Sequence, residues 1–347
     1  MKDLYLKGRN TMPASKSFFK LLDEYKEKKR ILWAPCIYDA FSASCAEAVG
    51  FEAVTISSGE MSKAMVGVPM GLQSFDEIVY ATEKICQATN MAVLCDGENG
   101  GAEPEKVYRF VKKVAEVGAM AVTIEDTNPH FLGMSNLPRK VYKGTDDEML
   151  LLNERYMDAD LWATNIRAAV EAVKGTDCMV IARVDSKGAP SGLFNKLLGN
   201  GLGLDEAIRR AQMGVEAGAP MTMIQSVTGN TEYHRHEWQE ICKRVPGYHV
   251  FPDVMSTDGR PDASAEELYD VGYQMITCHG AMRGAFKGLM EYLRNLYETE
   301  NTVFIENDEI PGFPKAYSNV MFWDDYAERN KEYIDFYRKI HGFKETR

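Results

Sequence analysis

The sequence predicts an α/β protein that closes into a (β/α)₈ barrel, the TIM-barrel fold, and three observations support this prediction. Short apolar runs alternate with helical stretches from about residue 31 to residue 300. The apolar runs number eight, as a closed barrel of this type requires. Several helical stretches also end at a glycine, which is a common helix C-terminus, at Gly50, Gly118, Gly218 and Gly272.

The predicted elements follow one another in a regular order. A first stretch, Ser15–Lys29, carries Phe18 and Leu22 on one face and polar residues opposite, so we expect a helix that packs against the main body. The predicted strands are Ile31–Cys36, Ala53–Ser58, Ala92–Gly97, Ala121–Asp126, Met179–Val184, Met221–Ser226, Tyr248–Val254 and Met275–Gly280. The predicted helices between them are Ala40–Val49, Phe75–Ala88, Pro104–Val117, Ala159–Val173, Leu204–Ala217, Thr231–Val245 and Ala263–Val271.

The alternative architecture is an open, doubly wound sheet with a nucleotide site. Its Gly-x-Gly-x-x-Gly motif is missing between the first strand and helix, where Pro35–Ala40 stands instead. The glycine-dense stretch Gly199–Gly203 precedes a helix but follows a long loop, so we interpret it as a hinge. We therefore predict one barrel domain over residues 31–300, between an N-terminal helical segment over 1–30 and a C-terminal helical extension over 301–347.

The C-terminal region is predicted to be helical and is rich in aromatic residues. A helix is expected over Ala281–Glu298, and a final one over Tyr317–His341, after a connection marked by Pro311, Gly312 and Pro314. The apolar residues of the final segment are Tyr317, Met321, Phe322, Trp323, Tyr326, Tyr333 and Phe336. Such a segment needs cover, either from its own barrel or from a neighbouring subunit.

Composition limits the classes of function. A formal net charge of -11 argues against nucleic acid or an anionic membrane as the main partner, because both would need a basic face. No apolar run approaches the roughly 18 residues of a membrane span, and Met1–Lys7 lacks a signal-peptide core, so we expect a cytoplasmic protein. The seven cysteines show no Cys-x-x-Cys spacing, which favours reduced thiols over disulfides or a zinc site.

Carboxylates end two consecutive predicted strands. Asp96 and Glu98 follow the third apolar run, and Glu125 ends the fourth. Because strands of a barrel emerge at one mouth, these acids form a candidate cluster of oxygen ligands for a hard cation such as Mg²⁺. The alternative for each acid is a cap on the following helix. The loops that leave the fourth and fifth strands, residues 127–158 and 185–203, are long enough to act as lids.

Several short motifs then occur in a fixed order: Pro35–Ala43, Gly50–Val54, Asp96–Gly101, Ile124–Asp126, Ile181–Asp185, Gly203–Ala207 and Glu216–Ala219. In order and spacing they resemble the isocitrate lyase/phosphoenolpyruvate mutase superfamily over roughly residues 30 to 300. The resemblance implies a (β/α)₈ barrel, Mg²⁺ dependence, and making or breaking of C–C or C–P bonds next to a 2-oxo acid through an enolate. It also implies a homo-oligomer, a tetramer, in which a C-terminal helix swaps between subunits.

The resemblance also implies roles for single residues. Asp96 is similar to the direct metal ligand, while Glu98, which replaces the usual second Asp, and Glu125 would hold metal-bound waters. Mn²⁺ is the alternative ion, since Glu98 is one methylene longer than Asp. Ser57, Ser58 and Gly59 resemble the loop whose hydroxyl and N–H groups hold the 2-oxo carboxylate. The alternative for that stretch is a plain strand-to-helix turn.

Four further residues carry substrate contacts by the same resemblance. Arg183 resembles the catalytic arginine that contacts the anionic groups of the substrate, with a structural salt bridge as the alternative. Gln225 falls where relatives carry Glu or His, and Asp253 where lyase members often have Asn. Arg283 aligns with another carboxylate-binding arginine of the lyase branch.

The chain departs from both branches of the superfamily. The loop over residues 128–137 lacks the Lys-Lys/Arg-Cys-Gly-His motif, whose cysteine is the general acid or base of isocitrate and methylisocitrate lyases. Met70 and Thr127 stand where mutases and phosphonopyruvate hydrolases have Asp and Lys. His130 and Asn136 remain as loop candidates for proton transfer. His279, after the eighth strand, is a further candidate, and a merely solvated side chain is the alternative for either histidine.

Three hypotheses result. The first is a Mg²⁺-dependent lyase that cleaves a C–C bond in a small anionic 2-hydroxy or 2-oxo acid, with Asp96, Glu98 and Glu125 at the ion. The second is a phosphonopyruvate-type mutase or hydrolase. The third is a barrel that binds a metabolite without turnover, which would show ligand affinity and no product with any metal.

Overall fold

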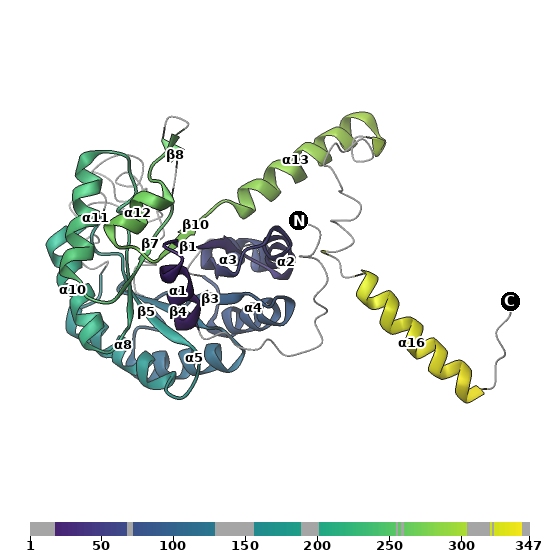
Figure 1. Cartoon of the computed structure of the whole chain (residues 1–347), viewed down its shortest axis with the longest axis horizontal. Helices are drawn as coiled ribbons and strands as arrows, with labels where there is room; N and C mark the ends of the chain where they lie inside the picture. Colours follow the sequence, from purple (N-terminus) through teal and green to yellow (C-terminus); the bar gives the residue numbers. More distant parts are fainter. Residues whose placement is uncertain are drawn as a thin grey trace.

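The computed structural model describes residues 18–67, 72–128, 156–188, 201–254, 256–257, 260–303, 320 and 323–341. Its centre is a closed parallel barrel in the order β1-β10-β7-β6-β5-β4-β3-β2 (Figure 1). The barrel strands are β1 (Leu32–Ile37), β2 (Ala53–Ile56), β3 (Ala92–Asp96), β4 (Ala121–Glu125), β5 (Met179–Val184), β6 (Met221–Ile224), β7 (Tyr248–Phe251) and β10 (Met275–Cys278). Each corresponds to one predicted apolar run, so the predicted (β/α)₈ barrel is confirmed.

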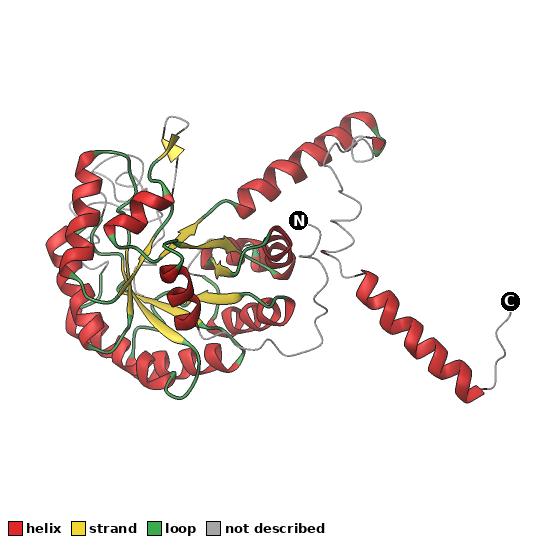
Figure 2. Ribbon diagram, viewed as in Figure 1, coloured by secondary structure: helices red, strands yellow, loops and turns green. Residues whose placement is uncertain are grey.

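Helices surround the strands, as Figure 2 shows by colour. The predicted ones appear as α2 (Ala40–Val49), α4 (Phe75–Ala88), α5 (Pro104–Glu116), α8 (Ala159–Ala172), α10 (Leu204–Glu216), α11 (Glu232–Arg244) and α12 (Ala265–Val271). Local capping fixes their starts. Ser74 and Glu77 form a capping box before α4. Ser264 accepts the N–H of Glu267 at 3.0 Å, so α12 begins at Ala265 and not at Ala263 as predicted.

Among the described residues, one helix and one hairpin were not predicted. The helix α3 (Ser58–Val66) begins directly after β2, so the stretch interpreted as a loop, Ser57–Gly59, is a helix N-terminus. Its buried side chains are Ser58, Met61 and Ser62, a mostly polar set that apolar periodicity does not reveal. The second is a small antiparallel hairpin of β8 (Ser256–Thr257) and β9 (Arg260–Pro261).

The strands separate two apolar cores. The inner core fills the barrel with alternate strand residues such as Leu32, Leu94 and Ile181. The outer core lies between the strands and the helices. The helix α1 (Phe18–Glu27) adds the buried side chains of Phe18 and Leu22 to the inner core, so the predicted packing of this helix against the main body is confirmed.

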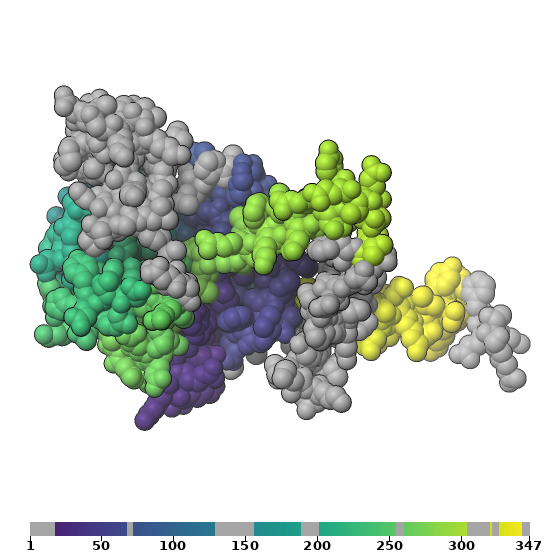
Figure 3. All heavy atoms as spheres, turned by 90° about the horizontal axis from the view of Figure 1, so that it is seen from above, coloured from purple at the N-terminus to yellow at the C-terminus, as the bar shows by residue number. Residues whose placement is uncertain are grey.

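Two helices in the described C-terminal part of the chain project from the barrel. Figure 1 shows α13 (Ala281–Thr299) extending away from the barrel and α16 (Trp323–His341) standing apart, and the same two segments are light green and yellow in Figure 3. Large apolar side chains are exposed on both, namely Phe286, Leu289, Met290, Leu293, Tyr297, Tyr326, Tyr333, Ile334, Phe336, Tyr337 and Ile340. Tyr317, Met321, Phe322 and the side chain of Trp323 lie outside the described residues. The domain boundaries at residues 30 and 300 stay a prediction.

None of the described helices combines the length and the apolar character that crossing a bilayer requires.

One buried histidine couples stability to pH. His249 on β7 lies between Thr222, whose hydroxyl is 3.0 Å from Nδ1, and the ring of Tyr273. Burial lowers the pKa of His249 from 6.5 to about 4. As pH falls below 6.5, His249 binds a proton in the unfolded chain but stays neutral in the folded chain. The free energy of unfolding therefore decreases as pH falls from 6.5 to about 4.

We expect the free energy of unfolding to drop by about 2 kcal/mol from this residue between about pH 7.5 and pH 5. Urea titrations at both values measure it. In His249→Asn the difference in the free energy of unfolding between the two pH values should be smaller by that amount. In His236→Asn, which alters an exposed histidine on α11, this difference should stay the same as in the native protein. An equal pH response in His249→Asn and the native protein would refute the assignment.

Candidate active site

The last inward-facing residues of β3, β4 and β5 meet at the barrel mouth. Asp96 follows Ala92 and Leu94 on the inner face, and Arg183 follows Met179 and Ile181. The strand register sets Glu125 beside Arg183. The structure therefore brings Asp96, Glu125 and Arg183 together, as expected for the carboxyl ends of neighbouring parallel strands.

Arg183 is surrounded by carboxylates. Its Nη1 lies 3.2 Å from Asp96 Oδ1, and its Nη2 lies 3.2 Å from Glu125 Oε2. Its Nε and Nη2 donate to the two oxygens of Asp185 at 2.8 and 3.0 Å, a bidentate pair. Burial acts to lower the pKa of Arg183, but the carboxylates of Asp185, Glu125 and Asp96 outweigh it and raise that pKa. The guanidinium is thus a fixed cation at the floor of the mouth.

Asp96 is held by neutral donors as well. Its Oδ2 accepts the Ser58 hydroxyl at 2.8 Å, and its Oδ1 accepts the Thr123 hydroxyl at 3.1 Å. Burial acts to raise the pKa of Asp96, but Arg183 and these hydrogen bonds outweigh it, so the pKa is lowered. Asp96 is therefore an anion that is ready to bind a cation.

Glu125 lies deeper in the mouth. Its Oε1 accepts the Thr127 hydroxyl at 2.5 Å. Burial raises the pKa of Glu125 to about 8, with the charges of Asp185 and Asp96 acting in the same direction against Arg183. Beside it, Asp126 accepts the backbone N–H of Asp185 at 2.7 Å and so joins the ends of β4 and β5.

Glu98 lies at the mouth next to Asp96. Its backbone has a φ of 48°, a left-handed conformation that is unusual for a residue other than glycine. Its N–H donates to Asp96 Oδ1 at 3.3 Å, and its Oε1 accepts from Gln73 at 2.9 Å. Gly97, between Glu98 and Asp96, leaves no room for a side chain, because a Cβ would come within 2.6 Å of the Thr123 carbonyl oxygen.

The start of α3 faces the same acids. Ser57 is the N-cap of α3, and its hydroxyl accepts the N–H of Glu60 at 3.3 Å. Ser58 reaches Asp96 through its hydroxyl, as described above, and its N–H lies 3.5 Å from Asp96 Oδ2. Ser57, Ser58 and Gly59 thus form a helix N-terminus, where free N–H groups and the helix dipole favour an anion.

The remaining candidates follow β6, β7 and β10. Gln225 follows the inward residues Met221 and Met223 of β6. Asp253, after β7, has a φ of 49° and accepts from His279, its Oδ1 lying 2.5 Å from Nδ1. Arg283 is exposed on the first turn of α13, and its charge acts to lower the pKa of Glu60.

The two loop candidates, His130 and Asn136, lie outside the described residues, as does Met70. Thr127 is described and donates to Glu125. His279 is a secondary candidate in the sequence, and the structure places its ring against Asp253. The available signal is positional, because His279 follows the carboxyl end of a barrel strand.

The carboxylates at the mouth are candidate ligands for a divalent ion. Within the described ranges, no three His, Cys, Asp or Glu side chains converge as a ready-made metal site. Mg²⁺ usually keeps several waters and binds through one or two carboxylates, so it does not need such a group. One guanidinium faces the carboxylates of Asp96, Glu125 and Asp185, which leaves an excess of negative charge when these acids are ionised. Hard oxygen donors with unbalanced charge fit Mg²⁺ or Mn²⁺.

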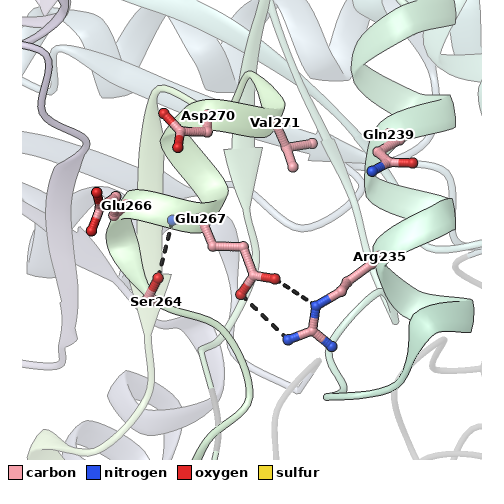
Figure 4. Close-up of a pocket in the computed structure, with 7 residues that line it drawn as sticks. All are labelled: Arg235, Gln239, Ser264, Glu266, Glu267, Asp270 and Val271. Carbon is pink, nitrogen blue, oxygen red and sulfur yellow. Dashed lines mark hydrogen bonds and ion pairs between the residues drawn. The ribbon is translucent and has the colours of Figure 1, made fainter.

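A surface cavity lies elsewhere on the barrel. It has a volume of about 390 Å³ between α11 and α12 and is lined by acidic residues together with Arg235 (Figure 4). Arg235 is already paired with Glu267, at 2.5 Å. The cavity contains none of the mouth residues described above, and the charges of its carboxylates disfavour an anionic substrate.

Comparison with known proteins gives consistent results. The family model described as phosphoenolpyruvate phosphomutase matches residues 22–296. The petal death protein of Dianthus caryophyllus is 28% identical over 306 residues, which cover 87% of this chain and 85% of that protein. A 2-methylisocitrate lyase of Aeropyrum pernix is 25% identical, with 90% of each chain covered. The crystal structure of a 2,3-dimethylmalate lyase superposes with a TM-score of 0.70 at 21% identity, covering 92% of this chain and 99% of that one.

Proposed function

Because the chain belongs to the phosphoenolpyruvate phosphomutase family, within the isocitrate lyase/phosphoenolpyruvate mutase superfamily of enzymes, we propose that it is a divalent-metal-dependent lyase. It would cleave a C–C bond in a small 2-hydroxy or 2-oxo dicarboxylate through an enolate. Named relatives include C–C lyases, such as the 2-methylisocitrate lyase. The observation that carries the proposal is the contact between Asp96, Arg183 and the N-terminus of α3 at the barrel mouth.

Each part of that arrangement has a role in the proposal. Asp96, Glu98 and Glu125 would hold Mg²⁺ or Mn²⁺, which when bound supplies Lewis-acid polarisation of the substrate oxygen. The hydroxyl of Ser57 and the N–H groups of Ser58 and Gly59 would bind the substrate carboxylate. Arg183 would lie beside the charge that develops on cleavage, where a fixed cation stabilises it without reorganisation.

Gln225, Asp253 and Arg283 would contact the remainder of the substrate. His130 and Asn136 stay proposed loop residues for proton transfer. We further infer a homo-oligomer, a tetramer with swapped C-terminal helices, because the apolar faces of α13 and α16 are left exposed by their own barrel. Sedimentation equilibrium measures the subunit number.

The second candidate is C–P chemistry on a phosphonopyruvate-like substrate. The description of the matching family model favours it. Thr127 weighs against it, because its hydroxyl is bound to Glu125 at the position where the resemblance requires a lysine.

The test is a screen of the purified protein with Mg²⁺ or Mn²⁺ against malate and citrate analogues, 2-oxo acids and phosphonopyruvate. Assays for pyruvate, glyoxylate, oxalate and CO₂ detect the products. We expect a C–C substrate to turn over and Asp96→Ala to lose about 1,000-fold or more of that activity, since a metal ligand is removed. Asp76→Ala, which breaks an exposed pair with Lys113, is the matched control and should stay active. Turnover of phosphonopyruvate alone would select the second candidate, and metal-dependent binding without any product would leave only a binding protein.

A further inference from the structure

A buried glutamine, Gln73, joins two parts of the candidate site. Its Nε2 donates to Glu98 Oε1 at 2.9 Å and, over a longer distance of 3.4 Å, to the backbone carbonyl oxygen of Ser58. Both N–H bonds of the amide are thereby used. Glu98 belongs to the proposed metal residues, and Ser58 begins the helix at the proposed carboxylate site. The amide of Gln73 therefore contacts the groups proposed for the ion and for the substrate carboxylate.

Helix capping does not account for a glutamine at this position. Gln73 directly precedes Ser74, the N-cap of α4, whose capping box with Glu77 fixes the start of that helix. The residue before an N-cap is often apolar and packs against the fourth residue of the helix, which here is the buried Ile78. The capping motif therefore favours an apolar side chain before Ser74, and the amide needs another explanation.

The amide is also kept at an energetic cost. Gln73 is 9% exposed, and its Oε1 is buried without a hydrogen-bond partner in the described part of the chain. A buried acceptor that lacks a hydrogen bond lowers the free energy of unfolding. Methionine, which is unbranched like glutamine, would fill the space without this penalty. What it could not supply is the hydrogen bond from Nε2 to Glu98.

Glu98 has a fixed backbone but a long side chain. Its N–H donates to Asp96 Oδ1 at 3.3 Å, and its carbonyl oxygen accepts the N–H of Glu125 at 2.8 Å. Several rotatable bonds lie between this backbone and the carboxylate, and holding them in one conformation costs entropy. A donor that is itself buried reduces the number of positions that the carboxylate can occupy.

We propose that Gln73 is the positioning residue of Glu98 and that it thereby sets the affinity of the site for its divalent ion. The amide, which also contacts the Ser58 carbonyl, holds the Glu98 carboxylate at one place in the mouth. It compensates in this way for the methylene by which glutamate is longer than aspartate. The inference rests on the proposed function, because it needs a metal ion at Asp96 and Glu98.

Binding of Mn²⁺ in the absence of substrate tests the inference, with the free ion measured by electron paramagnetic resonance. We expect Gln73→Met to raise the dissociation constant of Mn²⁺ about 10-fold or more, as loss of a group that orients a metal-binding side chain typically does. Gln73→Asn withdraws the amide by one methylene and should have the same effect. Gln87→Met, which removes an exposed glutamine of α4 paired with Glu83, is the matched control and should bind Mn²⁺ like the native protein.

A double-mutant cycle separates an action through Glu98 from a general effect on the fold. Glu98→Asp keeps a carboxylate at the site but moves it back by one methylene, out of reach of the amide. In this background, Gln73→Met should change the dissociation constant of Mn²⁺ less than about twofold, because no contact between the two side chains is left to remove.

The outcomes distinguish the inference from the proposed function. An unchanged or tighter affinity for Mn²⁺ in Gln73→Met and Gln73→Asn would overturn the inference and leave the lyase proposal standing. An equal loss of affinity with Glu98 and with Asp at that position would also overturn it, because Gln73 would then act through the fold. Failure of the native protein to bind Mn²⁺ would overturn the proposed metal site, and the role of Gln73 with it.

Discussion

Replacement of Arg183 by methionine is expected to remove turnover and to lower the free energy of unfolding by about 3–5 kcal/mol. The side chain has nearly the same volume, but the carboxylates of Asp96, Glu125 and Asp185 would lose the one guanidinium that contacts all three. Breaking a buried pair from one side costs more than the pair contributes, because uncompensated charges stay behind. Urea titration measures the free energy of unfolding, and turnover of the substrate identified in the screen measures the activity.

Two further variants sharpen this result. Arg183→Lys keeps the charge but loses the planar fork, so it should recover part of the stability and little of the activity. Arg209→Met removes an exposed arginine that pairs with Glu206 on the same helix, and should cost less than about 1 kcal/mol. Full activity in Arg183→Met would contradict the role proposed for the guanidinium, and a stability loss as small as that of Arg209→Met would contradict the buried network.

Leu289→Glu is expected to dissociate the proposed oligomer. Phe286, Leu289 and Leu293 form a stripe at helical spacing on α13, and all three are exposed in the single chain. A carboxylate in the centre of such a stripe would be buried without a partner if a second subunit covered it, at a cost of several kcal/mol. Sedimentation velocity should therefore show a smaller species than for the native protein.

The matched control is Leu161→Glu, because Leu161 is an exposed leucine on α8 of the barrel wall. That variant should keep the native mass. An unchanged mass in Leu289→Glu, or a native protein that sediments as a monomer at all concentrations, would rule out α13 as the interface.

The strands could be predicted because both of their faces are buried. All six residues of β5 are buried, so the strand appears in the sequence as an apolar run that only Arg183 interrupts. Helices such as α4 could be predicted because their cap residues and their apolar stripe are both visible in the sequence. The helix α3 was not predicted because its buried face is made largely of serine. Neither its composition nor the spacing of its apolar residues distinguishes it from a turn.

The candidate site could be predicted only in part. Asp96, Glu125 and Arg183 end neighbouring strands, so chain order alone indicated that they would meet. The contact of Asp253 with His279 depends on the pairing of β7 with β10, the strands that these two residues follow. Neither residue type gives a sign of such a partner in the sequence. Backbone conformation at Glu98 and Asp253, both with positive φ, is likewise set by tertiary contacts.

The closing pair of strands also bears on how the protein is made. Leu32 pairs with Met275, so β1 is synthesised long before its final neighbour. Until Met275–Cys278 has left the ribosome, one side of β1 presents unpaired N–H and C=O groups, the kind of edge that another nascent chain can pair with. Chains of high contact order remain in this state for longest. The vulnerable period of this protein therefore spans most of its translation and ends with its eighth barrel strand, which is when chaperone protection would matter most.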